Sequence, residues 1–142
     1  MDATPTGSRD GTPVLAMRGL VKVYGEGESA VRALDGIDFA VHTGEFVAVM
    51  GASGSGKSTC MNILGFLDVA TSGSYRFLDA EVTTLDRDQR ALLRRKHLGF
   101  VFQGFNLLAR TSALENVELP LIYRGLRAQT RRERALSALA AV

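Results

Sequence analysis

The stretch "GASGSGKST", residues 51–59, combines small residues with a single lysine, between a short apolar run and an apolar helical pattern. The spacing G-x-x-x-x-G-K-[ST] of a phosphate-binding loop is met by Gly51, Gly56, Lys57 and Ser58. Glycine lets backbone N–H groups approach phosphate oxygens closely because it has no Cβ. The stretch therefore predicts a nucleotide-phosphate site, and a flexible Gly/Ser turn is the alternative. The predicted binding residues are Gly51, Ala52, Ser53, Gly54, Ser55, Gly56, Lys57, Ser58 and Thr59.

Two residues outside this loop could complete a nucleotide site. Tyr24 ends a strand pattern in "LVKVYG" and could present an aromatic face to a purine, although simple packing is the alternative. Gln103 follows "LGFVF" and could place its amide oxygen near a metal or a water, unless it is an ordinary loop glutamine. One cysteine and two distant histidines do not supply a zinc site. The dinucleotide-binding motif G-x-G-x-x-G is excluded here, because Gly54 and Gly56 would need a third glycine at the position of Thr59.

The elements before the loop are predicted to be strands. Residues 14–24 form a strand pattern interrupted at Gly19, which indicates a bulge or turn. Asp35-Gly36 is a hairpin signal, and residues 37–41 alternate as in a half-buried strand. The run "EFVAVM", residues 45–50, is typical of a strand covered on both faces.

After the loop, strands and helices are predicted to alternate. The helix that follows the loop is weakened or ended at Gly65, and "TSGSYRFLD" indicates a turn that leads into a strand. Residues 85–96 suit a surface helix, and "LGFVFQ" is typical of a buried strand. "ALENVELPLIYRG" predicts a helix stopped near Pro120. Residues 127–142 form a helical pattern with one apolar side, made by Leu136, Leu139 and Ala140.

Composition indicates a globular protein. The 142 residues are 46% hydrophobic and 23% charged, with a net charge of +2, which is enough apolar material for one core. We expect residues 1–13 to form a disordered tail and residues 14–142 to form the domain. Basic clusters at 94–97 and 131–134 indicate solvated helix faces or, alternatively, an acidic partner or anionic membrane, and no charge block suggests nucleic acid. The lone Cys60 favours a reducing, cytoplasmic setting. No signal peptide and no run of about 18 apolar residues occur, so another chain must hold the protein at any membrane.

Four segments in this order resemble the ATP-binding subunits of ABC transporters. "LVKVYG" is similar to the family's adenine-stacking segment, "GASGSGKST" to its phosphate loop, "TSGSYRF" to the following turn and strand, and "GFVFQ" to its glutamine loop. Within this family, the chain most resembles the branch of macrolide export and lipoprotein release, through the segments "GASGSGKSTCMNILGFLD", "GFVFQGFNLL" and "ALENVELPLIYRG". The resemblance covers residues 14–142 and the first part of the family's domain.

The resemblance implies an α/β fold, in which a partial P-loop NTPase core adjoins a small antiparallel β subdomain and the start of a helical subdomain. ATP and Mg²⁺ are the implied cofactors. Tyr24 would stack on adenine, Lys57 would stabilise phosphate charge, and Ser58 and Gln103 would hold Mg²⁺. The implied partners are an integral-membrane permease and a second ATP-binding subunit. The implied location is the inner face of the cell membrane, where the permease would hold the cytoplasmic subunit.

Motifs for hydrolysis are missing from the sequence. After Gln103 the only glycines are Gly104 and Gly125, which excludes an LSGGQ-like signature. No later apolar run ends in Asp-Glu, as a Walker B segment would, and His42 and His97 lie too early to be the switch histidine. We therefore expect a domain truncated before the signature, which binds ATP without turnover, whereas the complete protein would hydrolyse ATP to energise a permease. The alternatives are another P-loop NTPase, such as a GTPase or nucleotide kinase, and a non-catalytic nucleotide-binding module; no NKxD motif is present.

Overall fold

The computed structural model describes residues 11–104 and 106–142. Of the predicted tail, residues 1–10 lie outside the described residues, and residues 11–13 carry no helix or strand. The chain divides into two compact units, residues 1–91 and residues 92–142, and each is described by itself.

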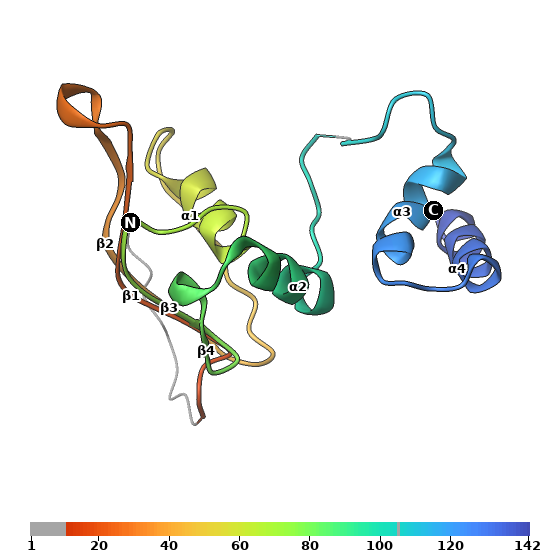
Figure 1. The fold of residues 1–142 in the computed structure, drawn as a ribbon, viewed down its shortest axis with the longest axis horizontal. Coiled ribbons are helices and arrows are strands. Elements are labelled where there is room, and N and C mark those ends of the chain that lie inside the picture. The colour runs from red at the N-terminus through yellow and green to blue at the C-terminus, as the bar shows by residue number, and fades with distance from the viewer. Residues whose placement is uncertain (1–10, 105) are drawn as a thin grey trace. The chain divides into compact units, whose positions relative to one another are not determined.

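The first unit contains a four-stranded sheet whose neighbouring strands all pair antiparallel, in the order β2-β1-β3-β4 (Figure 1). This confirms the predicted small antiparallel β region. A short 3₁₀ helix joins β1 to β2, and a second follows β4. The elements are β1 (Leu15–Tyr24), η1 (Gly27–Ser29), β2 (Val31–Val41), β3 (Ser72–Phe77), β4 (Ala80–Glu81) and η2 (Val82–Thr84).

Two sequence signals in β1 and β2 have different outcomes. The interruption predicted at Gly19 is confirmed, since the register of β1 shifts between Met17 and Leu20. The hairpin predicted at Asp35-Gly36 is wrong, because β2 runs straight through these residues. They form a bulge instead: Leu20 pairs with Ile37 while Lys22 pairs with Leu34. Gly36 supports the bulge with a positive φ of 68°.

The core of the first unit lies between the sheet and the helix α1 (Lys57–Leu64), which ends at Gly65 as predicted. The centroid of the Phe66 ring lies 5.6 Å from the ring centroid of Tyr75 and 5.2 Å from that of Phe77. The Tyr75 hydroxyl donates to Leu64 O at 3.0 Å, which ties β3 to the end of α1, and burial raises the pKa of this phenol. The buried apolar side chains of the unit are Met17, Leu20, Leu34, Cys60, Ile63, Phe66, Tyr75, Phe77 and Val82.

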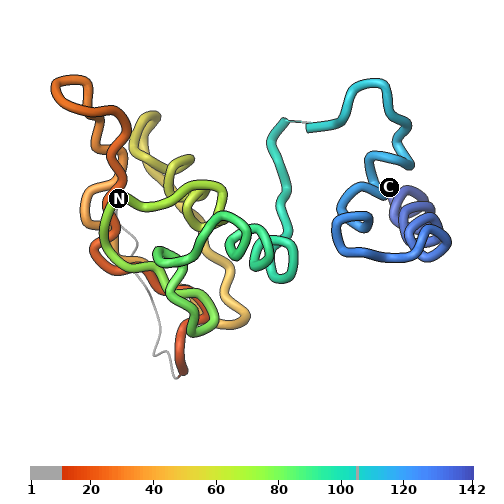
Figure 2. The backbone as a smooth tube through the Cα atoms, in the orientation of Figure 1, coloured from red at the N-terminus to blue at the C-terminus, as the bar shows by residue number. Residues whose placement is uncertain are grey.

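Two predicted buried strands are wrong. Residues 45–50 and 98–103 form no strand, and Phe46 and Val101 are almost completely exposed. Figure 2 shows the backbone between β2 and α1 as a loop that runs away from the strands. A strand covered on both faces needs hydrogen-bonded neighbours, and none of the strands in the described part of the chain pairs with either segment. Apolar composition alone therefore did not make these segments strands.

The surface helix predicted at residues 85–96 is present as α2 (Arg87–His97) and has no buried residue. Its start is fixed by Asp86, which accepts from the N–H of Gln89 at 2.8 Å, while Gln89 Oε1 accepts from the N–H of Asp86 at 3.0 Å. This reciprocal pair places the helix start two positions later than the predicted residue Leu85.

The second unit contains α3 (Ala113–Tyr123) and α4 (Ala128–Ala140), which pack against each other (Figure 1). The predicted stop near Pro120 is wrong, because α3 continues through this proline to Tyr123. Proline removes only its own N–H, and Arg124 N–H still donates to Pro120 O at 3.2 Å. The predicted apolar side of the last helix is also wrong in part, since Ala135 is fully buried and Leu136 is exposed. Across residues 11–104 and 106–142, no helix has both the length and the apolar character to cross a membrane.

Candidate functional site

The loop of residues 51–59 passes directly into α1. Gly56 is the N-cap of this helix, with φ 85° and ψ 5°, and no side chain caps the helix start. The first turn of a helix has N–H groups without partners inside the helix. Ser55 N–H donates to Ala52 O at 3.2 Å and so curves the loop, while Cys60 N–H donates to Gly56 O at 2.8 Å. The N–H groups of this first turn are therefore left to a partner outside the helix.

The ammonium of Lys57 lies inside the loop. Its Nζ donates to Gly51 O at 2.8 Å and to Ala52 O at 2.6 Å. These bonds place the positive charge between the first residues of the loop and the start of α1. The partial positive charge of the helix N-terminus adds to it. The arrangement attracts an anion.

Gly56 fits the loop against β2. A Cβ at Gly56 would lie 2.3 Å from Ala33 O and 2.9 Å from Leu34 Cδ2. The register of β1 and β2 skips Ala33, because Lys22 pairs with Leu34 and the next residue pairs beyond Ala33. This bulge in β2 touches the loop, and only a residue without a side chain leaves room for it.

Tyr24 is the last residue of β1, as predicted, and the residue is 41% exposed. Its hydroxyl donates to Asp68 Oδ2 at 2.7 Å, and Lys22 Nζ lies 4.7 Å from the centroid of its ring. The ring is therefore held at a strand end with part of its surface open. Sequence reasoning did not single out Lys22 or Asp68. The available signal for Lys22 was its spacing, because residues two apart on a strand share a face.

Asp68 connects the end of β1 to the segment after α1. Its Oδ1 accepts from Lys22 Nζ at 2.7 Å, and the same ammonium donates to Val69 O at 2.8 Å. Partial burial acts to raise the pKa of Asp68, but hydrogen bonds from Lys22, Tyr24 and Val69 N–H outweigh it and hold the pKa below its ordinary value. The Asp68 carboxylate is therefore ionised at neutral pH, and each of its two oxygens accepts a hydrogen bond.

Gln103 is exposed and belongs to the second unit, whereas Ser58 belongs to the first. The structure therefore leaves their shared Mg²⁺ site as a prediction. In the part of the chain that is described, no group of three or more His, Cys, Asp or Glu side chains could hold a metal ion.

The donor set of the loop fits a nucleotide triphosphate with Mg²⁺. Residues 51–59 contain no carboxylate, and the first turn of α1 has no acidic residue. The groups at hand are backbone N–H donors, the Lys57 ammonium and the hydroxyls of Ser58 and Thr59. Phosphate oxygens accept from all of these, and a serine hydroxyl is a ligand for Mg²⁺ in such loops.

Comparison with known proteins identifies relatives of the whole chain. A family model described as "ABC transporter" matches residues 34–142. The macrolide export ATP-binding/permease protein MacB of Azoarcus sp. (strain BH72) is 50% identical over 140 residues, which are 99% of this chain and 21% of the relative. The pyoverdine export ATP-binding/permease protein PvdT of Pseudomonas syringae pv. syringae (strain B728a) is 55% identical over 129 residues, 90% of this chain and 20% of the relative.

A solved structure shares the fold. The dimeric post-hydrolysis structure of the ATP-binding cassette MJ0796 bound to ADP and Pi superposes with a TM-score of 0.81 and 43% identity. The match covers 89% of this chain and 56% of that one. The chain thus spans about a fifth of the length of the curated relatives and a little over half of this cassette.

Proposed function

Because this chain belongs to the ABC transporter family, we propose that it is the ATP-binding part of a subunit that energises an integral-membrane permease. The observation that carries the proposal is the loop at the start of α1. There the Lys57 ammonium lies within hydrogen-bond distance of two loop carbonyl oxygens, and the helix start has no side-chain cap. A phosphate group is the partner that satisfies such a set of donors.

Each site residue has a defined part in this proposal. Residues 51–59 surround the phosphates, with the Lys57 ammonium balancing their charge. Tyr24 offers its ring to the adenine. Ser58 and Gln103 would hold Mg²⁺, which when bound neutralises phosphate charge.

We further propose that this chain binds ATP without turning it over. Phosphoryl transfer depends on groups that position a water and stabilise charge at the γ-phosphate. The sequence provides a loop for the phosphates but no signature and no Asp-Glu pair after an apolar run. Hydrolysis belongs to the complete protein in this proposal.

The partners proposed are a permease and a second ATP-binding subunit. Support comes from relatives named as export ATP-binding/permease proteins and from a similar cassette solved as a dimer. In this arrangement the chain acts at the inner face of the cell membrane, held there by the permease.

Calorimetric titration of the 142-residue chain tests this function. With Mg²⁺ present we expect ATP to bind more tightly than GTP, because the family resemblance predicts that Tyr24 stacks on adenine. A clear preference for GTP would contradict the assignment, and an absence of nucleotide binding would refute it. Phosphate release measured in parallel is expected to stay at the rate of ATP in buffer, and a faster rate would contradict binding without turnover.

A further inference from the structure

The ring of Tyr24 is fixed by contacts from outside its own strand. Its hydroxyl donates to Asp68 Oδ2 at 2.7 Å, across 44 residues of sequence. Asp68 Oδ1 in turn accepts from Lys22 Nζ at 2.7 Å. A carboxylate that holds both a phenol and an ammonium restricts the ring and the lysine together.

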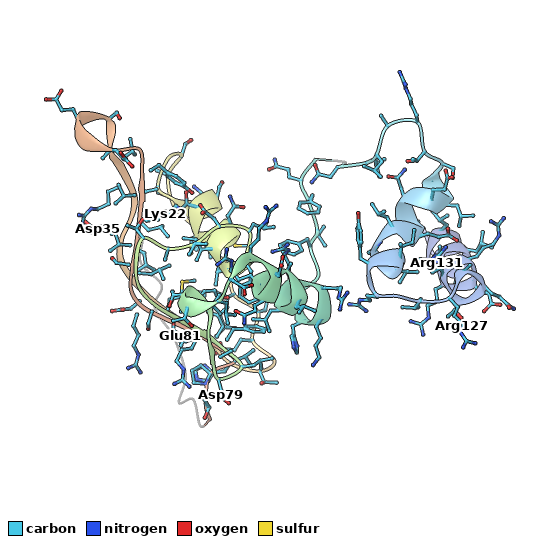
Figure 3. The ribbon with its side chains drawn as sticks, viewed as in Figure 1. Lys22, Asp35, Asp79, Glu81, Arg127 and Arg131 are labelled. Atoms are coloured by element: carbon cyan, nitrogen blue, oxygen red, sulfur yellow. The ribbon has the colours of Figure 1, made fainter. Side chains whose placement is uncertain are left out.

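The Lys22 ammonium covers one face of the ring. Nζ lies 4.7 Å from the ring centroid, which is within the range of a cation–π contact. The Lys22 side chain is only 12% exposed, and in Figure 3 Lys22 lies between β1 and α1. Because its charge is already paired with Asp68 and Val69 O, this ammonium does not move away easily. A stacking partner therefore has only the opposite face of Tyr24 available.

The position of Asp68 is itself fixed by α1. Asn62 O accepts from the N–H of Leu67 at 2.8 Å and from the N–H of Asp68 at 3.2 Å. The helix that carries the phosphate loop at its start thus holds the carboxylate just after its end. One rigid element connects the predicted base contact to the predicted phosphate contact.

We propose that Asp68 and Lys22 are positioning residues that hold the Tyr24 ring with one face presented to a purine base. This inference rests on the proposed function. Because the Tyr24 ring is already held in place, less conformational entropy is lost when a nucleotide binds. Asp68 and Lys22 therefore raise affinity through the base of the nucleotide. Neither residue belongs to the loop of residues 51–59, which is the predicted phosphate contact.

The test separates the two ends of the nucleotide by titrating the 142-residue chain with Mg²⁺ and either ATP or inorganic triphosphate, which has no base. We expect Asp68→Ala to weaken ATP binding about fivefold, the scale of one lost hydrogen bond, and to leave triphosphate binding unchanged. Tyr24→Phe keeps the ring and loses the hydroxyl, so we expect a smaller loss in the same direction.

Asp35→Ala is the matched control. Asp35 also pairs with a cation at 2.7 Å, that of Arg32, but both side chains are mostly exposed. In Figure 3 Asp35 lies on the side of the strands away from α1. We expect this variant to bind both ligands as the wild type does.

A double variant tests whether Asp68 acts through the phenol. In the Tyr24→Phe background, Asp68→Ala should cost less ATP affinity than in the wild type, since the bond between the two is already gone. Fully additive losses, equal losses for ATP and triphosphate, or no loss would each overturn the inference while leaving ATP binding by the wild type intact. A wild-type chain that binds triphosphate but not ATP would overturn the proposed function as well.

Discussion

The helices α1 and α3 begin in opposite ways. At α3, Ser112 Oγ accepts from Glu115 N–H at 3.2 Å, and Glu115 Oε2 accepts from Ser112 N–H at 2.7 Å, which is a complete capping box. At α1, Gly56 offers no side chain and the first turn has no acidic residue. Both helices expose N–H donors at their start, but only α3 satisfies them from its own sequence.

The difference is that the start of α3 satisfies its own N–H donors, whereas the start of α1 leaves its donors open to a ligand. A capping box stabilises a helix whether or not any ligand is present. A glycine start next to Lys57 gives up that stabilisation and leaves donors and positive charge for an anion. Variants at the two starts should therefore separate ligand binding from stability.

The largest expected effect on ligand binding is the loss of ATP affinity in Lys57→Ala. Removing a charged donor from a phosphate is worth roughly 1.5 to 3 kcal/mol, so affinity should fall roughly 10- to 150-fold. Calorimetric titration with ATP and Mg²⁺ measures it. Lys96→Ala, in the last turn of α2, is the control and should leave the affinity within about twofold. Unchanged affinity in Lys57→Ala would remove the functional side of the comparison.

The largest expected effect on stability lies at the start of α1. Gly56→Ala combines a left-handed backbone with a contact to Ala33 O, so we expect it to lower the free energy of unfolding by about 2 to 4 kcal/mol. Gly54→Ala is the matched control, with φ 78° but open space around its Cβ, and should cost only about 1 to 2 kcal/mol. Urea denaturation followed by circular dichroism compares the two. Equal losses would show that contact with β2 does not position the loop.

A smaller effect is expected at the start of α3. Ser112→Ala removes the cap and should destabilise α3 by about 1 kcal/mol. ATP affinity should stay that of the wild type, because this helix start belongs to no predicted ligand contact. Hydrogen exchange of the α3 amides, with ATP titration alongside, measures both. A variant that loses ATP affinity without losing amide protection would reverse the contrast with α1.

The smallest effect is the pH dependence of that cap. Hydrogen bonds from the Ser112 side chain and backbone hold the pKa of Glu115 below its ordinary value of 4.5. Because the folded pKa is the lower one, the stabilisation is complete above the ordinary value and is lost as pH falls through the folded value. Amide protection of α3 in the wild type should thus fall as the solution is acidified, while the bond from Glu115 N–H to Ser112 Oγ stays. In Glu115→Gln, which cannot titrate, the protection of α3 should show no such dependence, and a wild type that behaves like it would contradict the assignment.

The two wrong strand predictions share one cause. Residues 45–50 and 98–103 have the apolar composition of buried strands, yet Phe46 and Val101 stand exposed. A strand exists only when another backbone satisfies its N–H and C=O groups, and composition does not say where that backbone comes from. The hairpin signal Asp35-Gly36 failed for a related reason, since pairing with β1 continued past it as a bulge.

The sequence by itself predicted a phosphate-binding loop at residues 51–59 and the helix α1 that follows it. Glycine, lysine and serine at fixed spacing dictate a local backbone and its charge, and the predicted helix follows the loop in the structure. Only the tertiary structure decided the setting of Tyr24, because Lys22 and Asp68 lie 46 residues apart and meet through the packing of α1 on the sheet. It also decided that the bulge at Ala33 touches Gly56. Local conformation follows from residue type, whereas contacts between distant residues follow from packing that no short stretch encodes.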